Sequence, residues 1–418
     1  FMLVDRRPSL ISHVRRRYDK AGKQVFEDVN AWEALSEILT SILEDPLLQT
    51  TYLIIDALDE CTTGQDQLLE LVAQKSSEYP HVKWIVSSRN WPTIEEILNT
   101  ATQKTKLWLE VNETSVAKAV AAFIHYKVQK LTDKKKYNEE TRYAVSQHLL
   151  SNAHGTFLWV ALVCENLANV PRRKVQKKLE EFPSGLDELY KRMLDQISDS
   201  DDAELCISVL SVILTVYRPI TLDELASCID LPEEIAGDSD LAEIIGLCGS
   251  FLTLRGRTIS LVHQSATDFL LREAAYKIFP DGADLVHYSI FSKSLGAITR
   301  TLRRDIYNLV HPGYPINQVN QPDPDPLVAI RYGCVYWVDH LNSCSPGKNA
   351  IEDFQDSGSV SIFFQNDYLH WLEALSLLRS LSKGVSSIPM LESLLKVCFH
   401  QCKQGIILTL FILDNRGE

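Results

Sequence analysis

The first hundred residues alternate amphipathic helical faces with short, unbroken apolar runs. Over residues 31–43 the apolar positions recur every three or four residues, which predicts a helix that Asp45-Pro46 ends. The runs at residues 52–55 and 82–86 are short and rich in strand formers, so they predict strands, with a helix around residues 68–72 between them. This order predicts a βαβ unit in a parallel sheet that helices cover.

The strand predicted over residues 52–55 is apolar at every position. A strand of this kind is expected to be buried on both faces, as in sheets with helices on either side. A third strand is predicted over residues 106–111, where it would extend the same sheet.

After Asn112 the strand signals stop and helical spacing takes over. Apolar positions predict helices over residues 116–128, 143–150 and 157–167, and the polar run 133–140 is expected to be the loop between the first two.

A new helical unit is predicted from Gly185, where Leu186, Leu189 and Met193 begin one apolar face. Thr221 followed by Glu224 has the spacing of a capping box and predicts another helix start.

A hairpin is predicted around Arg255-Gly256-Arg257, because residues 251–254 and 258–262 alternate apolar and polar side chains. Helices that end in one hairpin describe a winged-helix domain. Beyond residue 274 several prolines interrupt the middle of the segment, and residues 368–381 predict one amphipathic helix.

These patterns predict an α/β fold followed by mainly helical regions. We expect an α/β core over residues 1–111, a helical domain over 112–184, a winged-helix domain over 185–275 and an all-α region over 276–418.

Charge is uneven along the chain. The 42 basic and 55 acidic residues leave a formal net charge of −13, which argues against a protein that coats nucleic acid. Residues 195–245 hold thirteen acidic side chains and a single basic one, Arg218, so a winged helix there would repel DNA phosphates. The first 25 residues carry seven basic side chains against Asp5 and Asp19, which favours a solvated helix face over a nucleic-acid contact.

The nine cysteines are scattered and form no C-x-x-C pair, so we expect reduced thiols in a cytoplasmic protein. No signal peptide opens the chain, and the longest apolar run, residues 206–217, is too short to span a membrane.

The sharpest candidate for chemistry is LIIDALDE, residues 53–60. Acidic residues at the carboxyl end of a buried parallel strand lie where open α/β sheets bind ligands. In nucleotide hydrolases the first acid, here Asp56, holds Mg²⁺, and a following acid orients the attacking water. The alternative is a strand that simply ends in a polar cap.

The next strand ends in Ser87-Ser88-Arg89. Because parallel strands end at the same edge, Arg89 is expected to share a cleft with Asp56 and to neutralise a phosphate there. Taken alone, an arginine at such a position is more often a surface residue.

A third candidate is His263, which follows the predicted hairpin in LVHQSATDFLL and precedes a helix. It could donate to a phosphate, although its spacing alone favours a buried, hydrogen-bonded core histidine.

Several motifs in order resemble the NACHT-type STAND NTPases of filamentous fungi, in particular the HET-E-like vegetative incompatibility proteins with a nephrocystin-like nucleotide module. The resemblance covers roughly residues 1–275 and extends more loosely to about residue 395. The motifs are LIIDALDE, SSRN, HGTFLWVALV, GLDELYKRML, RPITLDEL and LVHQSATDFLL.

The resemblance implies that Asp56 is the Walker B magnesium ligand and that Asp59 and Glu60 are the acidic pair that positions water. Arg89 is then similar to the sensor arginine, and His263 to the winged-helix histidine that contacts the β-phosphate of ADP. In that family ADP holds a closed state, and exchange for ATP releases it to oligomerise, so the implied cofactors are Mg²⁺ and ATP or ADP.

The chain departs from the family pattern because it contains no G-x-x-x-x-G-K-[ST] phosphate loop. Gly22-Lys23 has neither the upstream glycine nor the serine or threonine that this loop requires. We therefore expect a fragment of such a switch that binds nucleotide weakly or not at all by itself, and hydrolysis by this chain is not implied.

The alternative is a non-catalytic regulatory or scaffold protein that uses the degenerate NTPase fold as an interaction surface. In either case we expect protein partners or self-association through the NTPase and winged-helix surfaces, with no nucleic acid and no membrane.

Overall fold

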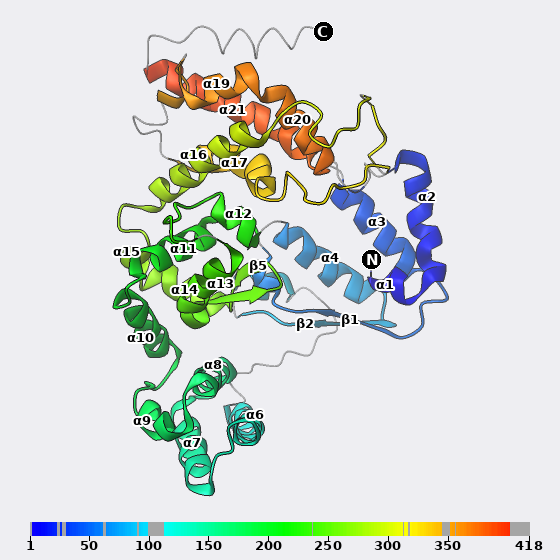
Figure 1. Ribbon diagram of the computed structural model, residues 1–418. Helices are drawn as coiled ribbons and strands as arrows, with labels where there is room; N and C mark the ends of the chain where they lie inside the picture. Colours follow the sequence, from blue (N-terminus) through cyan, green and yellow to red (C-terminus); the bar gives the residue numbers. More distant parts are fainter. Residues whose placement is uncertain are drawn as a thin grey trace. The chain divides into compact units, whose positions relative to one another are not determined.

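The computed structural model describes residues 2–22, 26, 31–61, 64–89, 92–98, 113–235, 237–311, 313–316, 318–344, 352–355 and 357–401. The chain divides into two compact units, residues 1–111 and 112–418 (Figure 1). Both are mostly helical, and the first contains a small parallel sheet. The predicted α/β class is therefore confirmed at this level.

The sheet of the first unit consists of β1 (Thr51–Ile55) and β2 (Val82–Val86), which pair in parallel with Ile55 opposite Val86. The crossover between them contains α4 (Gln65–Glu78), as the predicted βαβ unit requires. The predicted third strand, residues 106–111, lies outside the described residues. The other elements of this unit are α1 (Met2–Arg6), η1 (Pro8–Leu10), α2 (Ile11–Ala21), α3 (Ala31–Leu43), η3 (Leu58–Glu60) and α5 (Pro92–Leu98).

Helices pack on one face of this sheet (Figure 1). Leu53 and Trp84 contact the apolar face of α3, and further along the strands Ile55 packs with residues of η3, α4 and α5. On the opposite face Tyr52 is 64% exposed, Ile54 70% and Ile85 52%. The expectation that β1 is buried on both faces is therefore wrong for the described residues. Apolar content shows that a side chain tolerates burial, but only a packed neighbour buries it.

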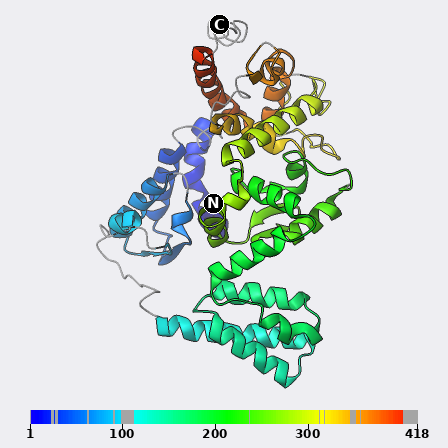
Figure 2. The ribbon, with the colours of Figure 1, turned by 90° about the vertical axis from the view of Figure 1, so that its left-hand side faces the viewer.

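The second unit begins with α6 (Glu113–Lys135), α7 (Glu139–Asn152) and α8 (Phe157–Asn169), which confirm the three predicted helices. They pack against one another (Figure 2). The predicted loop over residues 133–140 is too long, because α6 runs on to Lys135 and Asn138 already caps α7 by accepting from the Thr141 N–H. Two further helices, α9 (Val175–Leu179) and α10 (Leu186–Ser198), follow.

A helix–strand–helix–helix–hairpin order follows α10. The hairpin of β4 (Leu252–Arg255) and β5 (Thr258–Leu261) is confirmed, and β3 (Ile220–Thr221) adds to it in the antiparallel order β3-β5-β4. The capping box of Thr221 and Glu224 is confirmed as well. The helices of this region are α11 (Ala203–Thr215), α12 (Leu222–Ala226), α13 (Asp238–Leu247), α14 (Gln264–Arg272) and α15 (Ala275–Ile278).

The remaining elements form a second apolar core around Trp337, Phe363 and Trp371. The single helix predicted over residues 368–381 is wrong. It divides into α20 (Tyr368–Leu377) and α21 (Leu381–Gln401), because the intervening Arg379 takes a left-handed backbone conformation with φ of 56°. The other helices here are α16 (Ala283–Thr301), α17 (Arg331–Ser343) and α19 (Ser359–Asn366).

No helix among the described residues is both long enough and apolar enough to cross a membrane. The seven cysteines described with their side chains form no disulfide with one another, and all but Cys61 are buried.

A buried polar chain joins the hairpin region to α16 and α17. The Tyr217 N–H donates to the Tyr332 hydroxyl at 3.1 Å, and this hydroxyl lies 2.6 Å from Nε2 of His340. Nδ1 of His340 lies 2.9 Å from Nδ1 of His287. A hydroxyl carries one proton and two lone pairs, so the Tyr332 hydroxyl can donate to His340 Nε2 or accept from it, and the contact between the two Nδ1 atoms needs a proton on only one of them. Burial lowers the pKa of both histidines, so both imidazoles are neutral at pH 7.

Protonation of His340 is expected to destabilise this junction. His340 is 0% exposed, and burial together with the neighbouring His287 lowers its pKa from 6.5 to about 3. A lowered pKa in the folded state means that its stabilising contribution is complete above pH 6.5 and is lost as the pH falls towards 3.

We predict that the free energy of unfolding of the second unit falls by about 2 kcal/mol between pH 6.5 and pH 5 on account of His340 alone. Chemical denaturation of wild type and His340→Gln across this range measures the difference between their pH slopes. An identical pH slope in the two proteins would show that His340 does not cause the loss.

Candidate functional site

The carboxyl ends of β1 and β2 meet at one edge of the parallel sheet. The ladder continues past the strands, because the Ser87 N–H donates to the Ile55 carbonyl and the Leu58 N–H donates to the Ser87 carbonyl, both at 2.9 Å. The segment after β1 and the segment after β2 are therefore held side by side. This places the acidic residues of LIIDALDE next to Ser87-Ser88-Arg89.

Asp56, the predicted magnesium ligand, is exposed at this edge and is oriented from the neighbouring strand. The Ser87 hydroxyl donates to its carboxylate and also accepts the Ala57 N–H at 2.9 Å. One hydroxyl thus fixes both the side chain of Asp56 and the backbone that follows it. A carboxylate held by a hydroxyl at a solvent-facing edge suits Mg²⁺, which keeps most of its water ligands and takes one or two protein carboxylates.

Asp59 engages Arg89 twice. Its Oδ1 accepts the backbone N–H of Arg89 at 3.0 Å, and its Oδ2 lies 3.1 Å from the guanidinium Nε. The Asp59 side chain is only 7% exposed, whereas that of Arg89 is 39% exposed. The arginine therefore lies at the predicted edge and is paired with an acid of the same motif.

Leu58 anchors the turn that carries these acids. It is buried against Leu69 of α4 and Ile94 of α5, while Glu60, two residues later, is exposed. Because η3 is a 3₁₀ turn with about three residues per turn, the side chains of Leu58, Asp59 and Glu60 point in three different directions.

His263, the remaining predicted site residue, is the N-cap of α14 in the second unit. It is exposed, so the expectation of a buried core histidine is wrong. Its Nδ1 accepts the Ser265 N–H at 3.0 Å and lies 2.8 Å from the Ser265 hydroxyl, which in turn lies 3.0 Å from the Tyr190 hydroxyl. With Nδ1 acting as acceptor, the neutral ring carries its proton on Nε2.

The structure thus brings Asp56, Asp59 and Arg89 together within the first unit and places Glu60 on the same turn. Sequence reasoning missed the orienting role of Ser87, although its position directly after β2 was a usable signal. It also missed Ser265 and Tyr190, which fix the ring of His263. Their contacts depend on packing that no local pattern shows.

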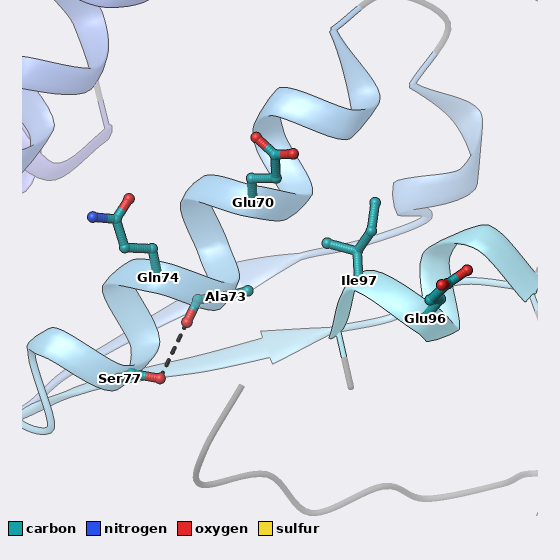
Figure 3. Close-up of a pocket in the computed structure, with 6 residues that line it drawn as sticks. All are labelled: Glu70, Ala73, Gln74, Ser77, Glu96 and Ile97. Atoms are coloured by element: carbon teal, nitrogen blue, oxygen red, sulfur yellow. Dashed lines mark hydrogen bonds between the residues drawn. The ribbon is translucent and has the colours of Figure 1, made fainter. Parts of the chain in front are cut away.

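A shallow groove of about 530 Å³ lies between α4 and α5 (Figure 3). It is lined by Glu70, Ala73, Gln74 and Ser77 from α4 and by Glu96 and Ile97 from α5. None of the strand-end residues lines it. The described residues contain no group of three or more ligating side chains that would hold a metal by themselves, so a cation at Asp56 would need ligands from water or from a bound phosphate.

Comparisons with known proteins agree with the resemblance that the motifs predicted. Residues 1–89 match the family described as nephrocystin 3, N-terminal, and residues 116–176 match a domain of unknown function, DUF7069. The chain is 51% identical over 412 residues to the vegetative incompatibility protein HET-E-1 of Podospora anserina. This match covers 94% of the chain and 30% of HET-E-1, so the chain spans less than a third of that relative. No solved structure matches the chain.

Ala57 is expected to be a point of local strain, because it adopts a left-handed conformation with φ of 52° between Asp56 and Leu58. We predict that Ala57→Gly raises the free energy of unfolding of the first unit by about 0.5 kcal/mol, since glycine adopts this conformation without a steric penalty. Urea denaturation measures this change. Ala34→Gly, inside α3, is the matched control and should destabilise by about 1 kcal/mol; destabilisation by both substitutions would contradict strain at Ala57.

The cap on α14 gives a second test. We predict that His263→Ala destabilises the second unit by about 1 kcal/mol, because the Ser265 N–H loses its acceptor. His263→Asn restores a side-chain oxygen at the N-cap and should regain most of that stability. Thermal denaturation of the three proteins decides the matter, and equal losses in both variants would contradict a capping role.

Proposed function

We propose that this chain, which is HET-E-like over nearly its whole length, is the switch portion of a STAND signalling NTPase that acts in fungal self/non-self recognition. The observation that carries the proposal is the placement of Asp56, Asp59 and Arg89 at one edge of a parallel sheet. Acids and an arginine at the carboxyl ends of adjacent parallel strands suit a nucleotide phosphate with its cation.

Each residue at this edge of the sheet would have a different role towards the nucleotide. Asp56, oriented by the Ser87 hydroxyl, would hold Mg²⁺, which when bound neutralises phosphate charge. Arg89 would place a positive charge beside the phosphate, and an acid of the Asp59-Glu60 pair would orient water. The 51% identity to HET-E-1 supports this reading of the motifs.

His263 would report on the nucleotide from the second unit. The element order from α11 to α14, with the antiparallel sheet β3-β5-β4, is the order expected of a winged helix. The Nε2–H of His263 would be the donor towards a phosphate, because Nδ1 is already used to cap α14. An exposed donor on a fixed ring suits a contact that forms in one state of a switch and breaks in the other.

The chain by itself is proposed to bind nucleotide weakly or not at all. Its sequence contains no G-x-x-x-x-G-K-[ST] loop, which supplies the backbone N–H groups and the lysine that hold the β- and γ-phosphates. A cation ligand and an arginine without that loop provide little binding free energy.

A scaffold role is the second candidate, and the charge distribution favours it. Arg15, Arg16 and Lys20 are exposed on α2, whereas residues 195–245 hold thirteen acidic side chains, of which all but the buried Glu224 are exposed or half-buried. Such surfaces would associate with a second copy or with a full-length relative through attraction that salt screens. A complex with such a relative that weakens with ionic strength would favour this candidate over the switch.

We predict that millimolar Mg·ADP produces no saturable change in the melting temperature of the chain, as measured by differential scanning fluorimetry. A protein in which a segment carrying the phosphate loop precedes Phe1 should gain a shift of a few degrees, since ligand binding stabilises the folded state.

In that extended protein Asp56→Asn should remove the magnesium-dependent shift, whereas Asp66→Asn, which removes the same charge from an exposed position on α4, should keep it. If Mg·ADP raises the melting temperature of the chain alone in a saturable way, and Asp56→Asn removes this rise, the proposal that the chain binds nucleotide weakly or not at all is wrong. If the extended protein binds Mg·ADP equally well with and without the Asp56 carboxylate, the proposed role of this chain as a nucleotide-dependent switch is wrong.

A further inference from the structure

We propose that Asp59 is a positioning residue for Arg89, and that Glu60 is the carboxylate of the acidic pair that faces a ligand. This inference rests on the proposed function and deepens it, because it separates two adjacent acids that the motif alone treats as equivalent. Asp56 keeps its role as the cation ligand.

The first argument is the use of the Asp59 oxygens. Oδ1 accepts the main-chain N–H of Arg89 at 3.0 Å and Oδ2 pairs with Nε at 3.1 Å, so both oxygens are directed at the same residue. A carboxylate engaged in this way would have to give up a charge-assisted hydrogen bond before it could orient water.

The second argument is burial. The side chain of Asp59 is 7% exposed, which leaves little surface for an incoming water, whereas Glu60 is an exposed residue. An acid with so little exposure is costly to leave unpaired, so its pairing with Arg89 is also what permits it to be charged there.

The third argument is the geometry of η3. Leu58 is fixed inward against Leu69 and Ile94, and Asp59 reaches Arg89 in the segment after β2. The 3₁₀ turn gives the exposed Glu60 a different direction from both. The order of residues in the turn therefore assigns the roles.

The pairing also fixes the direction of the arginine. A hydrogen bond from the main-chain N–H holds the Arg89 backbone, and an ion pair at Nε holds the first polar atom of the side chain close to Asp59. Asp59 therefore helps to orient the guanidinium before any phosphate arrives, and such preorganisation favours charge stabilisation.

The test observes Arg89 Nε–H by ¹H–¹⁵N NMR in the whole chain without nucleotide, with Arg89→Lys identifying the signal by its loss. We expect Asp59→Asn to speed hydrogen exchange at this group at least tenfold. The matched control, Glu60→Gln, removes the same charge one residue away and should leave the exchange rate within twofold of wild type. Circular dichroism confirms that the variants are folded.

Two outcomes would overturn the proposal: wild-type exchange in Asp59→Asn, or acceleration by Glu60→Gln equal to that by Asp59→Asn. Should Asp59→Asn fail to fold, Asp59→Glu keeps the charge but displaces the oxygens by one methylene, and it should also speed exchange several-fold. Because no nucleotide is present, failure here would leave the role of Asp56 untouched, and failure of the nucleotide experiments would leave this result standing.

Discussion

The parallel pairing of β1 and β2, with Ile55 opposite Val86, is the constraint on which the candidate site depends. Parallel strands end at the same edge of a sheet, so with this register the exposed segments that follow β1 and β2 start side by side. A slip of one residue would turn the apolar side chains that contact α3 to the opposite face, and the partial burial of Leu53 and Trp84 opposes such a slip. Apolar packing on one face therefore fixes the polar contacts at the edge.

Contacts from the segment after β2 then give Asp56 and Asp59, in the segment after β1, different partners. The hydroxyl of Ser87 orients Asp56, while Arg89 engages Asp59 through its backbone and its side chain. A similar arrangement occurs in the second unit, where one nitrogen of His263 caps a helix and the other keeps the proton. In both places an interaction within the protein occupies one polar group and so determines which other polar group is available to a ligand.

Much of the fold could be predicted from the sequence, because periodicity and caps are local signals. The helix over residues 31–43 and the hairpin around Gly256 are predicted with nearly the observed bounds. The exposure of Ile54 could not be predicted, since it depends on which elements pack against the sheet. The site was predicted as residue types at a common edge, but the pairing of Asp59 with Arg89 depends on the direction of a 3₁₀ turn that a buried Leu58 sets.

The most direct test of these cross-strand contacts is a double-mutant cycle of Asp59→Asn and Arg89→Gln, measured by urea denaturation of the first unit at low and high salt. If the two residues hold each other as described, their effects are non-additive by about 0.5 kcal/mol, and this coupling weakens as salt is added. Additive effects at both salt concentrations would contradict the account, because residues that stabilise the edge independently do not form one site.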